Sequence, residues 1–253
     1  MKPWQGFLII SSSSTLAHAL FPAPSNAQAG RSICAAAEKH VSSDSRLSEA
    51  VKAVFGSPEY SSQNVECIYP LQVLRYSDAD VLLAIGNEPG QACHGCSASL
   101  SAYVMRRKAS GLQLVNRFID FAQAGTFGNP GEISPLEIVG DDGFVVESGG
   151  TFQGYTSSSL DFYVFRHGRV VHLDPAIGLS ADNSGAMTDS TKEVSVAGEW
   201  TIGRPARNNL SIEYTVVTKS RTSVSRAVWE IRGDKLLLKR GLIPAELKAA
   251  GGG

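Results

Sequence analysis

The chain has 253 residues, of which 43% are hydrophobic and 19% charged, and its formal net charge is -1. These values are typical of a globular protein that buries a core, and they exclude a disordered chain. The balance of 23 Lys and Arg against 24 Asp and Glu provides no basic surface for nucleic acid or for anionic lipid. We therefore expect no nucleic-acid partner.

The first 29 residues have the three-part layout of a secretory signal peptide. Lys2 supplies a positive start, residues 7–21 are weakly hydrophobic, and Ala27-Gln28-Ala29 supplies a small-residue cleavage site. The hydrophobic stretch is too short and too rich in serine to cross a bilayer, and no later stretch reaches about 18 apolar residues. We therefore predict that residues 1–29 are removed, that the mature chain has no transmembrane segment, and that the protein is periplasmic or secreted.

Residues 30–62 are expected to form a helical N-terminal segment. Leu47, Val51 and Phe55 follow one another at four-residue intervals, which places them on one face of a helix. Gly56 and the proline at position 58 then predict the end of that helix.

Residues 63–253 are predicted to form a β domain. Runs of β-branched and aromatic residues are separated about every ten residues by Gly, Asn or Asp, which is typical of mainly β proteins. We expect an antiparallel sandwich or a propeller-like array of hairpins. The predicted strands are 67–75, 80–86, 98–106, 112–121, 136–139, 143–148, 160–166, 169–173, 193–202, 209–218, 225–232 and 235–239.

Two short turns can be assigned between predicted strands. His167-Gly168 and Gly233-Asp234 each separate two strand-forming runs, and each contains a glycine that can adopt a positive φ. A third hairpin is expected to have a longer loop, from Lys108 to Gly111. Residues 176–192 contain many Ser, Asn, Asp and Gly residues, which predicts an exposed loop between two groups of strands.

The chain contains four cysteines, and an even number in an exported protein favours disulfide bonds. Four cysteines allow three pairings. We predict Cys34–Cys67, which would tie the helical segment to the first long strand, and Cys93–Cys96.

The motif Cys93-His94-Gly95-Cys96 has several chemical interpretations. Haem attachment needs the histidine directly after the second cysteine, but Ser97 stands there. Thiol–disulfide exchange would use Cys93 as nucleophile, Cys96 as resolving thiol and His94 beside them, as in thioredoxin-like oxidoreductases. That chemistry needs a helix after the motif to stabilise the thiolate, whereas apolar residues alternate with polar ones from position 97 to 104, which predicts a strand.

Metal binding by this motif would need further ligands, because zinc prefers four. Only His167 and His172, far along the chain, are available to complete such a site. We favour a structural disulfide that fixes the loop before the next strand, and we expect no metal and no cofactor.

A resemblance to a group of proteins extends over about residues 80–175. Cys93-His94-Gly95-Cys96 leads into an aliphatic-aromatic strand that ends in Tyr103-Val104, and Phe127-Gly128 and Gly154-Tyr155 follow. This arrangement resembles uncharacterised exported bacterial proteins that have a C-H-x-C motif and a glycine-containing β domain. No activity is established for that group, so the resemblance implies export and a β architecture but no catalytic residues.

Other catalytic sets are incomplete. The sequence has no G-x-S-x-G elbow for a serine nucleophile and no phosphate-binding glycine loop. His172 and Asp174 are the one neighbouring histidine and carboxylate in the mature chain that could act together, and a solvated strand end explains them more simply. The chain is therefore more simply explained as a protein without enzymatic activity.

The segment 149–159 is a candidate binding loop because it combines glycine, hydroxyl and aromatic side chains. Phe152, Gln153 and Tyr155 are the predicted contact residues, since aromatic faces beside polar groups suit a glycan or a protein ligand. We expect a non-enzymatic binding, inhibitory or structural module of the bacterial envelope, with a protein or glycan ligand. The alternative is a periplasmic thiol–disulfide oxidoreductase that uses the cysteine motif.

Overall fold

The structure is a computed structural model that describes residues 32–61, 67–203 and 208–247. The predicted signal peptide, residues 1–29, lies outside this range. The fold is mainly β, as expected. Its strands are β1 (Ile33–Cys34), β2 (Tyr60–Ser61), β3 (Ile68–Arg75), β4 (Asp80–Gly86), β5 (Ala98–Lys108), β6 (Gly111–Ala124), β7 (Glu132–Ile138), β8 (Asp141–Phe152), β9 (Tyr155–Arg166), β10 (Arg169–Asp182), β11 (Val194–Ile202), β12 (Asn209–Thr218), β13 (Thr222–Arg232) and β14 (Lys235–Gly241). The helices are α1 (Ala37–Ser43), α2 (Ser45–Phe55) and the 3-10 turn η1 (Ser190–Lys192).

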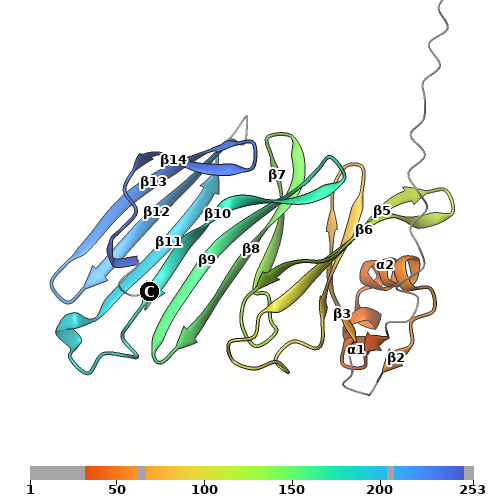
Figure 1. The fold of residues 1–253 in the computed structure, drawn as a ribbon, viewed down its shortest axis with the longest axis horizontal. Helices are drawn as coiled ribbons and strands as arrows, with labels where there is room; N and C mark the ends of the chain where they lie inside the picture. The colour runs from red at the N-terminus through yellow and green to blue at the C-terminus, as the bar shows by residue number, and fades with distance from the viewer. Residues whose placement is uncertain (1–31, 62–66, 204–207, 248–253) are drawn as a thin grey trace, which may run out of the picture.

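The strands form two sheets that pack in layers, which fits a sandwich. The first sheet has the order β2-β1-β3-β4-β5-β6 and the second the order β11-β12-β13-β14-β10-β9-β8-β7. Figure 1 shows the helices at one end of the molecule, then the first sheet, then β7 to β10, and β11 to β14 at the other end. Three hydrophobic cores separate these four layers.

The middle layers are buried on both faces because their strands carry apolar residues at successive positions, so that side chains on both faces of the strand are apolar. In β4, Leu82 faces the helices while its neighbour Leu83 faces the second sheet. In β8, Val145 faces β11 to β14 while its neighbour Phe144 faces the first sheet. A continuous apolar run is the sequence signature of a strand buried on both sides, and the run from Val81 to Ile85 has it.

The second sheet also closes on itself at one end of the molecule. β10 pairs with β9 along its length, and Asp174 in it pairs with Lys235 of β14. At its C-terminal end, Ala181 pairs with Val196 of β11. The strands β10 to β14 therefore form a ring around the core that contains Trp229.

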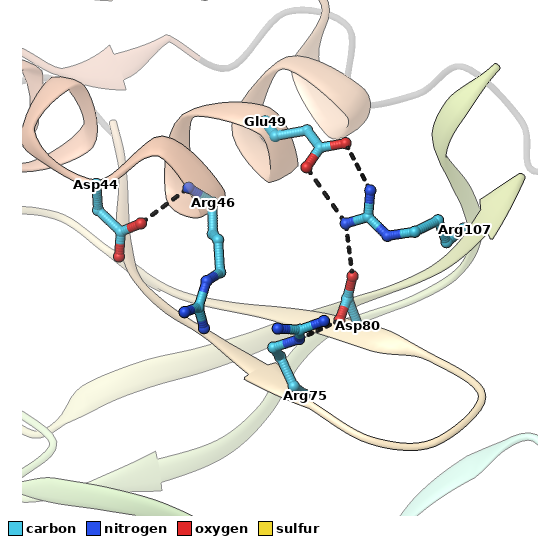
Figure 2. A network of polar contacts seen from close by, with 6 residues as sticks. All are labelled: Asp44, Arg46, Glu49, Arg75, Asp80 and Arg107. Carbon is cyan, nitrogen blue, oxygen red and sulfur yellow. Dashed lines mark hydrogen bonds and ion pairs between the residues drawn. The ribbon is translucent and has the colours of Figure 1, made fainter. Parts of the chain in front are cut away.

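The helices cover the outer face of the first sheet. Asp44 caps the N-terminus of α2, because its Oδ1 accepts a hydrogen bond from the backbone N–H of Arg46 at 2.9 Å (Figure 2). The same oxygen accepts a second bond from the backbone N–H of Leu47 at 3.2 Å. Leu47 and Val51 are fully buried against the sheet. The predicted helical stripe is thus the face that packs.

A chain of ion pairs fixes α2 to the strands below it (Figure 2). Arg107 of β5 donates to both carboxylate oxygens of Glu49, at 3.1 and 3.3 Å, and also to Asp80 at 3.3 Å. Arg75 lies 3.7 Å from the other oxygen of Asp80. Since Asp80 is nearly buried, the two guanidinium groups supply the partners that a buried carboxylate needs.

All twelve predicted strands are present, and both predicted disulfides are confirmed, at Cys34–Cys67 and Cys93–Cys96. The two-residue turns at His167-Gly168 and Gly233-Asp234 are also confirmed. The expected longer loop from Lys108 to Gly111 was wrong. These two residues pair with each other, so the loop is again only two residues long.

The predicted exposed loop at 176–192 was wrong over its first part, which belongs to β10. Ile177 and Leu179 are buried in the core that β10 shares with β11 to β14, and Ala181 is also buried. Pro175 and Gly178 obscured this alternation in the sequence, because both residues are poor in strands. The loop proper comprises residues 183–193.

The predicted binding loop at 149–159 was also wrong as a loop. The structure continues β8 to Phe152 and starts β9 at Tyr155, so that only Gln153 and Gly154 form the turn. Glycine and serine have low strand propensity, but the buried inner halves of β8 and β9 set a register that carries the pairing to the tip.

Removing the Cys34–Cys67 bridge should lower the free energy of unfolding by about 3–4 kcal/mol, because the bridge closes a loop with a separation of 33 residues. Urea unfolding of a Cys34→Ala/Cys67→Ala variant measures this loss. The matched control is Cys93→Ala/Cys96→Ala, whose loop is only 3 residues and whose removal should cost about 1–2 kcal/mol or less. Equal losses for both variants would contradict the argument.

Tyr214 should make the protein less stable at alkaline pH. Its buried hydroxyl donates to the carbonyl of Gly178 at 2.8 Å, and burial raises its pKa to about 12. An unfolded tyrosine titrates near pH 10, so between about pH 10 and 12 the unfolded state loses a proton that the folded state keeps. The free energy of unfolding should therefore fall as pH rises through this window.

The Tyr214→Phe variant should lose part of this pH dependence, on the order of 1–3 kcal/mol between pH 10 and 12. Burial also raises the pKa of Tyr76 and of Tyr163, so some dependence should persist in the variant. Urea unfolding at a series of pH values measures the slope for both proteins. If the free energy of unfolding falls equally steeply with pH in both proteins, burial does not raise the pKa of Tyr214.

Candidate functional site

The most unusual surface feature is a stack of three rings from three separate segments. The imidazole of His94 lies between the rings of Phe127 and Phe152, with centroid distances of 4.5 and 4.7 Å and interplanar angles of 13° and 6°. Both phenylalanines are exposed, at 44% and 49%. We call these three residues the aromatic stack.

The first segment of the site is the loop between β4 and β5, which carries the disulfide Cys93–Cys96. The backbone N–H of Cys96 donates to the carbonyl of Cys93 at 2.9 Å, which makes the motif a tight turn with His94 at its tip. Since the bridge spans only two intervening residues, the position of His94 is strongly restricted.

The second segment is the connection between β6 and β7, and it is joined to the disulfide loop by main-chain hydrogen bonds. The N–H of Phe127 donates to the carbonyl of His94 at 3.3 Å, and that of Gly128 donates to the carbonyl of Cys96 at 2.8 Å. The carbonyl of Phe127 accepts from Gly90 at 2.8 Å. Phe127 is therefore positioned by three bonds that do not involve its side chain.

The third segment is the tip of the β8–β9 hairpin. Gln153 and Gly154 have φ values of 51° and 85°, which turn the chain so that Phe152 pairs with Tyr155. A side chain at position 154 would lie 2.3 Å from the carbonyl carbon of Gly185. The loop 183–193 thus supports the tip from below, and position 154 requires glycine for its φ and for this close approach.

Two open hollows lie beside the aromatic stack. The first, of about 450 Å³, is lined by Phe127 and reaches Thr126 and Gly149. The second, of about 380 Å³, also includes Thr126 and Gly149 and continues along β8, β9 and β10. Because both hollows are lined by these two residues, they are adjacent, and we call the pair of hollows the depression.

Small and hydroxyl-bearing side chains dominate the second hollow. Thr126 donates to the carbonyl of Gly149 at 3.3 Å, and the hydroxyls of Ser158 and Ser180 lie 2.6 Å apart. Among the residues described by the structure, no charged side chain lines either hollow. The electrostatic character of the depression is therefore polar and uncharged.

The cysteine motif lacks the feature that exchange chemistry needs. Cys93 and Cys96 are exposed and bridged, and the chain that leaves Cys96 enters strand β5 at Ala98. A strand provides no aligned N–H groups and no positive dipole end to stabilise a thiolate. The expected strand after the motif is confirmed.

The alternative metal site does not assemble. His167 is in the β9–β10 turn, at the far end of the twelve-residue strand β9 from the tip, about 35–40 Å away at roughly 3.3 Å per residue. His172 is on β10, where it pairs with Tyr163. Within the described residues, no group of three or more His, Cys, Asp or Glu side chains is arranged to hold a metal ion.

The structure gives His172 and Asp174 different partners. Asp174 accepts a hydrogen bond from Lys235 at 3.0 Å, while the Nε2 of His172 lies 2.8 Å from Asp161. His172 lies opposite Tyr163 in the sheet, and Asp161, two residues before Tyr163 on β9, projects from the same face and so reaches the imidazole.

The structure brings together residues that the sequence analysis treated separately. Phe152, predicted as a binding residue, contacts His94, which was considered only for redox and metal chemistry. Gln153 is in the turn beside Phe152, and Tyr155 faces Phe152 across the hairpin. Phe127 was not predicted as a site residue, although an aromatic residue in a glycine-rich connection is a recognisable signal of an exposed ring.

Comparison with known proteins gives no further guidance, since no family model, no curated protein and no solved structure matches the chain. In residues 32–61, 67–203 and 208–247, the helices are too short or too polar to cross a membrane.

The aromatic stack should be visible in solution by proton NMR. The ring protons of His94 should be shifted upfield, because they lie above the faces of two phenyl rings at 4.5 and 4.7 Å. Phe152→Leu should move these signals towards their ordinary positions. The control is Phe55→Leu, which removes a ring that contacts Tyr103 instead. If the ring protons of His94 have ordinary chemical shifts in the unaltered protein, the imidazole is not stacked between the two phenyl rings in solution.

Proposed function

We propose that this protein is a non-enzymatic binding module of the bacterial envelope, and that the aromatic stack is the centre of its binding surface. The observation that carries this proposal is the exposure of three stacked rings held in place by three separate segments. Exposed rings with few rotatable bonds are the residues that most often dominate binding energy at interfaces.

The rigidity of the site supports binding in particular. The disulfide restricts His94, main-chain hydrogen bonds position Phe127, and the loop 183–193 supports the hairpin that carries Phe152. A surface that is already ordered before the ligand arrives loses less conformational entropy on binding. This support would be unnecessary for an incidental group of surface residues.

Export is part of the same proposal. The two disulfides are typical of proteins that fold outside the reducing cytoplasm, and the layout of residues 1–29 is that of a signal peptide. We therefore place the protein in the periplasm or the extracellular space, in agreement with its resemblance to exported bacterial proteins.

Loss of both phenyl rings should abolish capture of the ligand. Full-length protein on a solid support is exposed to a soluble extract of bacterial envelopes, and the bound material is quantified for the unaltered protein and for a Phe127→Ala/Phe152→Ala variant. Truncation of central aromatic contacts commonly costs 2 kcal/mol or more each, so the double variant should bind at least tenfold less at limiting ligand concentration.

The matched control is Leu237→Ala on β14, since Leu237 is 44% exposed, as is Phe127, but lies in the outermost layer. This variant should capture as much as the unaltered protein, and all three proteins should have the same unfolding temperature. Capture that survives loss of both rings would refute the proposal. Catalysed reduction of insulin disulfides that disappears in Cys93→Ser would instead establish the oxidoreductase.

A further inference from the structure

We infer that the ligand of this surface is a neutral oligosaccharide, which stacks on the phenyl rings and extends along the depression between Thr126 and β10. The inference rests on the proposed function and specifies its ligand class. The inference is drawn from three features of the stack and the two adjacent hollows: flat apolar faces, hydroxyl groups, and linings without charged side chains.

The rings provide the apolar part of the recognition. Phe127 lines the first hollow, and the ring of Phe152 lies 3.4 Å from the position that a Cβ on Gly150 would occupy in the second. The faces of aromatic rings carry partial negative charge. The C–H groups on one side of a pyranose carry partial positive charge and are nearly flat, so a sugar ring fits such a face.

The second hollow provides the polar part. Five serines contribute to its lining: Ser148, Ser157, Ser158, Ser159 and Ser180. A serine hydroxyl can donate one hydrogen bond and accept two, as can the hydroxyls of a sugar. The glycines at positions 149 and 150 leave the main chain of β8 open to the ligand, because they have no side chain to cover it.

The absence of charge selects a neutral ligand. Within the described part of the chain, neither hollow is lined by Asp, Glu, Lys or Arg. A carboxylate or phosphate on the ligand would find no counter-charge in these open hollows, so nothing in their linings would favour an anionic ligand over a neutral one. The hydroxyl lining offers hydrogen-bond donors and acceptors that the hydroxyls of a sugar can use and the side chains of an apolar peptide cannot, so it favours a sugar over such a peptide.

The size of the depression accommodates more than one sugar residue. The hollows measure about 450 and 380 Å³ and share Thr126 and Gly149. Each is within roughly the 300–1,000 Å³ range of sites for small organic ligands. A linear oligosaccharide of a few residues can therefore place one ring on the aromatic stack and the next beside the serines.

Titration of the full-length protein with maltotetraose, cellotetraose and tetra-N-acetylchitotetraose tests the inference, with amide NMR signals and calorimetry as readouts. At least one of the three should shift the signals of Thr126, Gly149 and Ser158. Phe152→Ala should weaken its binding at least tenfold and Ser157→Ala several-fold, because Ser157 projects from the same face of the sheet as Phe152, while Leu237→Ala should leave the dissociation constant unchanged. Unfolding temperatures establish that the variants remain folded.

The opposite results distinguish a wrong ligand class from a wrong function. If none of the three sugars binds, or if binding survives Phe152→Ala, the oligosaccharide inference is overturned. If, in addition, envelope capture still depends on Phe127 and Phe152, the binding function stands with a ligand of another class, and a panel of short apolar peptides should then shift the same signals. If capture does not depend on the two rings, the proposed function fails together with the inference.

Discussion

Burial of the central strands on both faces is the constraint on which the rest of the molecule depends. Strands such as β4 and β8 send successive side chains into different cores, so each strand links two layers. A change in register by one residue would exchange these two sets of side chains. The pairing of β8 with β9 is therefore strongly determined, and it continues outward from the buried part to the exposed tip.

The aromatic stack is held in place by this arrangement. Phe152 extends from β8, Phe127 from the connection that follows β6, and His94 from the loop that precedes β5. The strands β8, β6 and β5 all contribute to the core between the two sheets, through Phe144, Ala124 and Leu100 respectively. The three rings meet because their strands are packed together, and the disulfide and the supporting loop then restrict the last few residues.

The sequence predicts the strands well because their signal is local. In β12 and β13 the apolar alternation, the β-branched residues and the flanking turns agree with one another, and the predicted limits 209–218 match those of β12.

Prediction failed where tertiary packing overrides local preference. Residues 149–159 are rich in Gly and Ser, yet they are strands because the buried halves of β8 and β9 impose their register. The aromatic stack was beyond prediction for a related reason, since residues 94, 127 and 152 are separated along the chain and only the layer packing brings them together.

The ring formed by β10 to β14 has a consequence for the behaviour of the protein at high concentration. An outer strand with unpaired main-chain groups is a template for association with a second chain and for fibril growth. Here β11 is the last strand of its sheet, but its start is paired with the end of β10. The opposite border, β7, contains Pro135, which has no N–H to donate, and Gln72 donates to the carbonyl of Ile133 at 2.8 Å. Both borders of the larger sheet are thus protected against the edge-to-edge pairing of strands by which β-rich proteins aggregate.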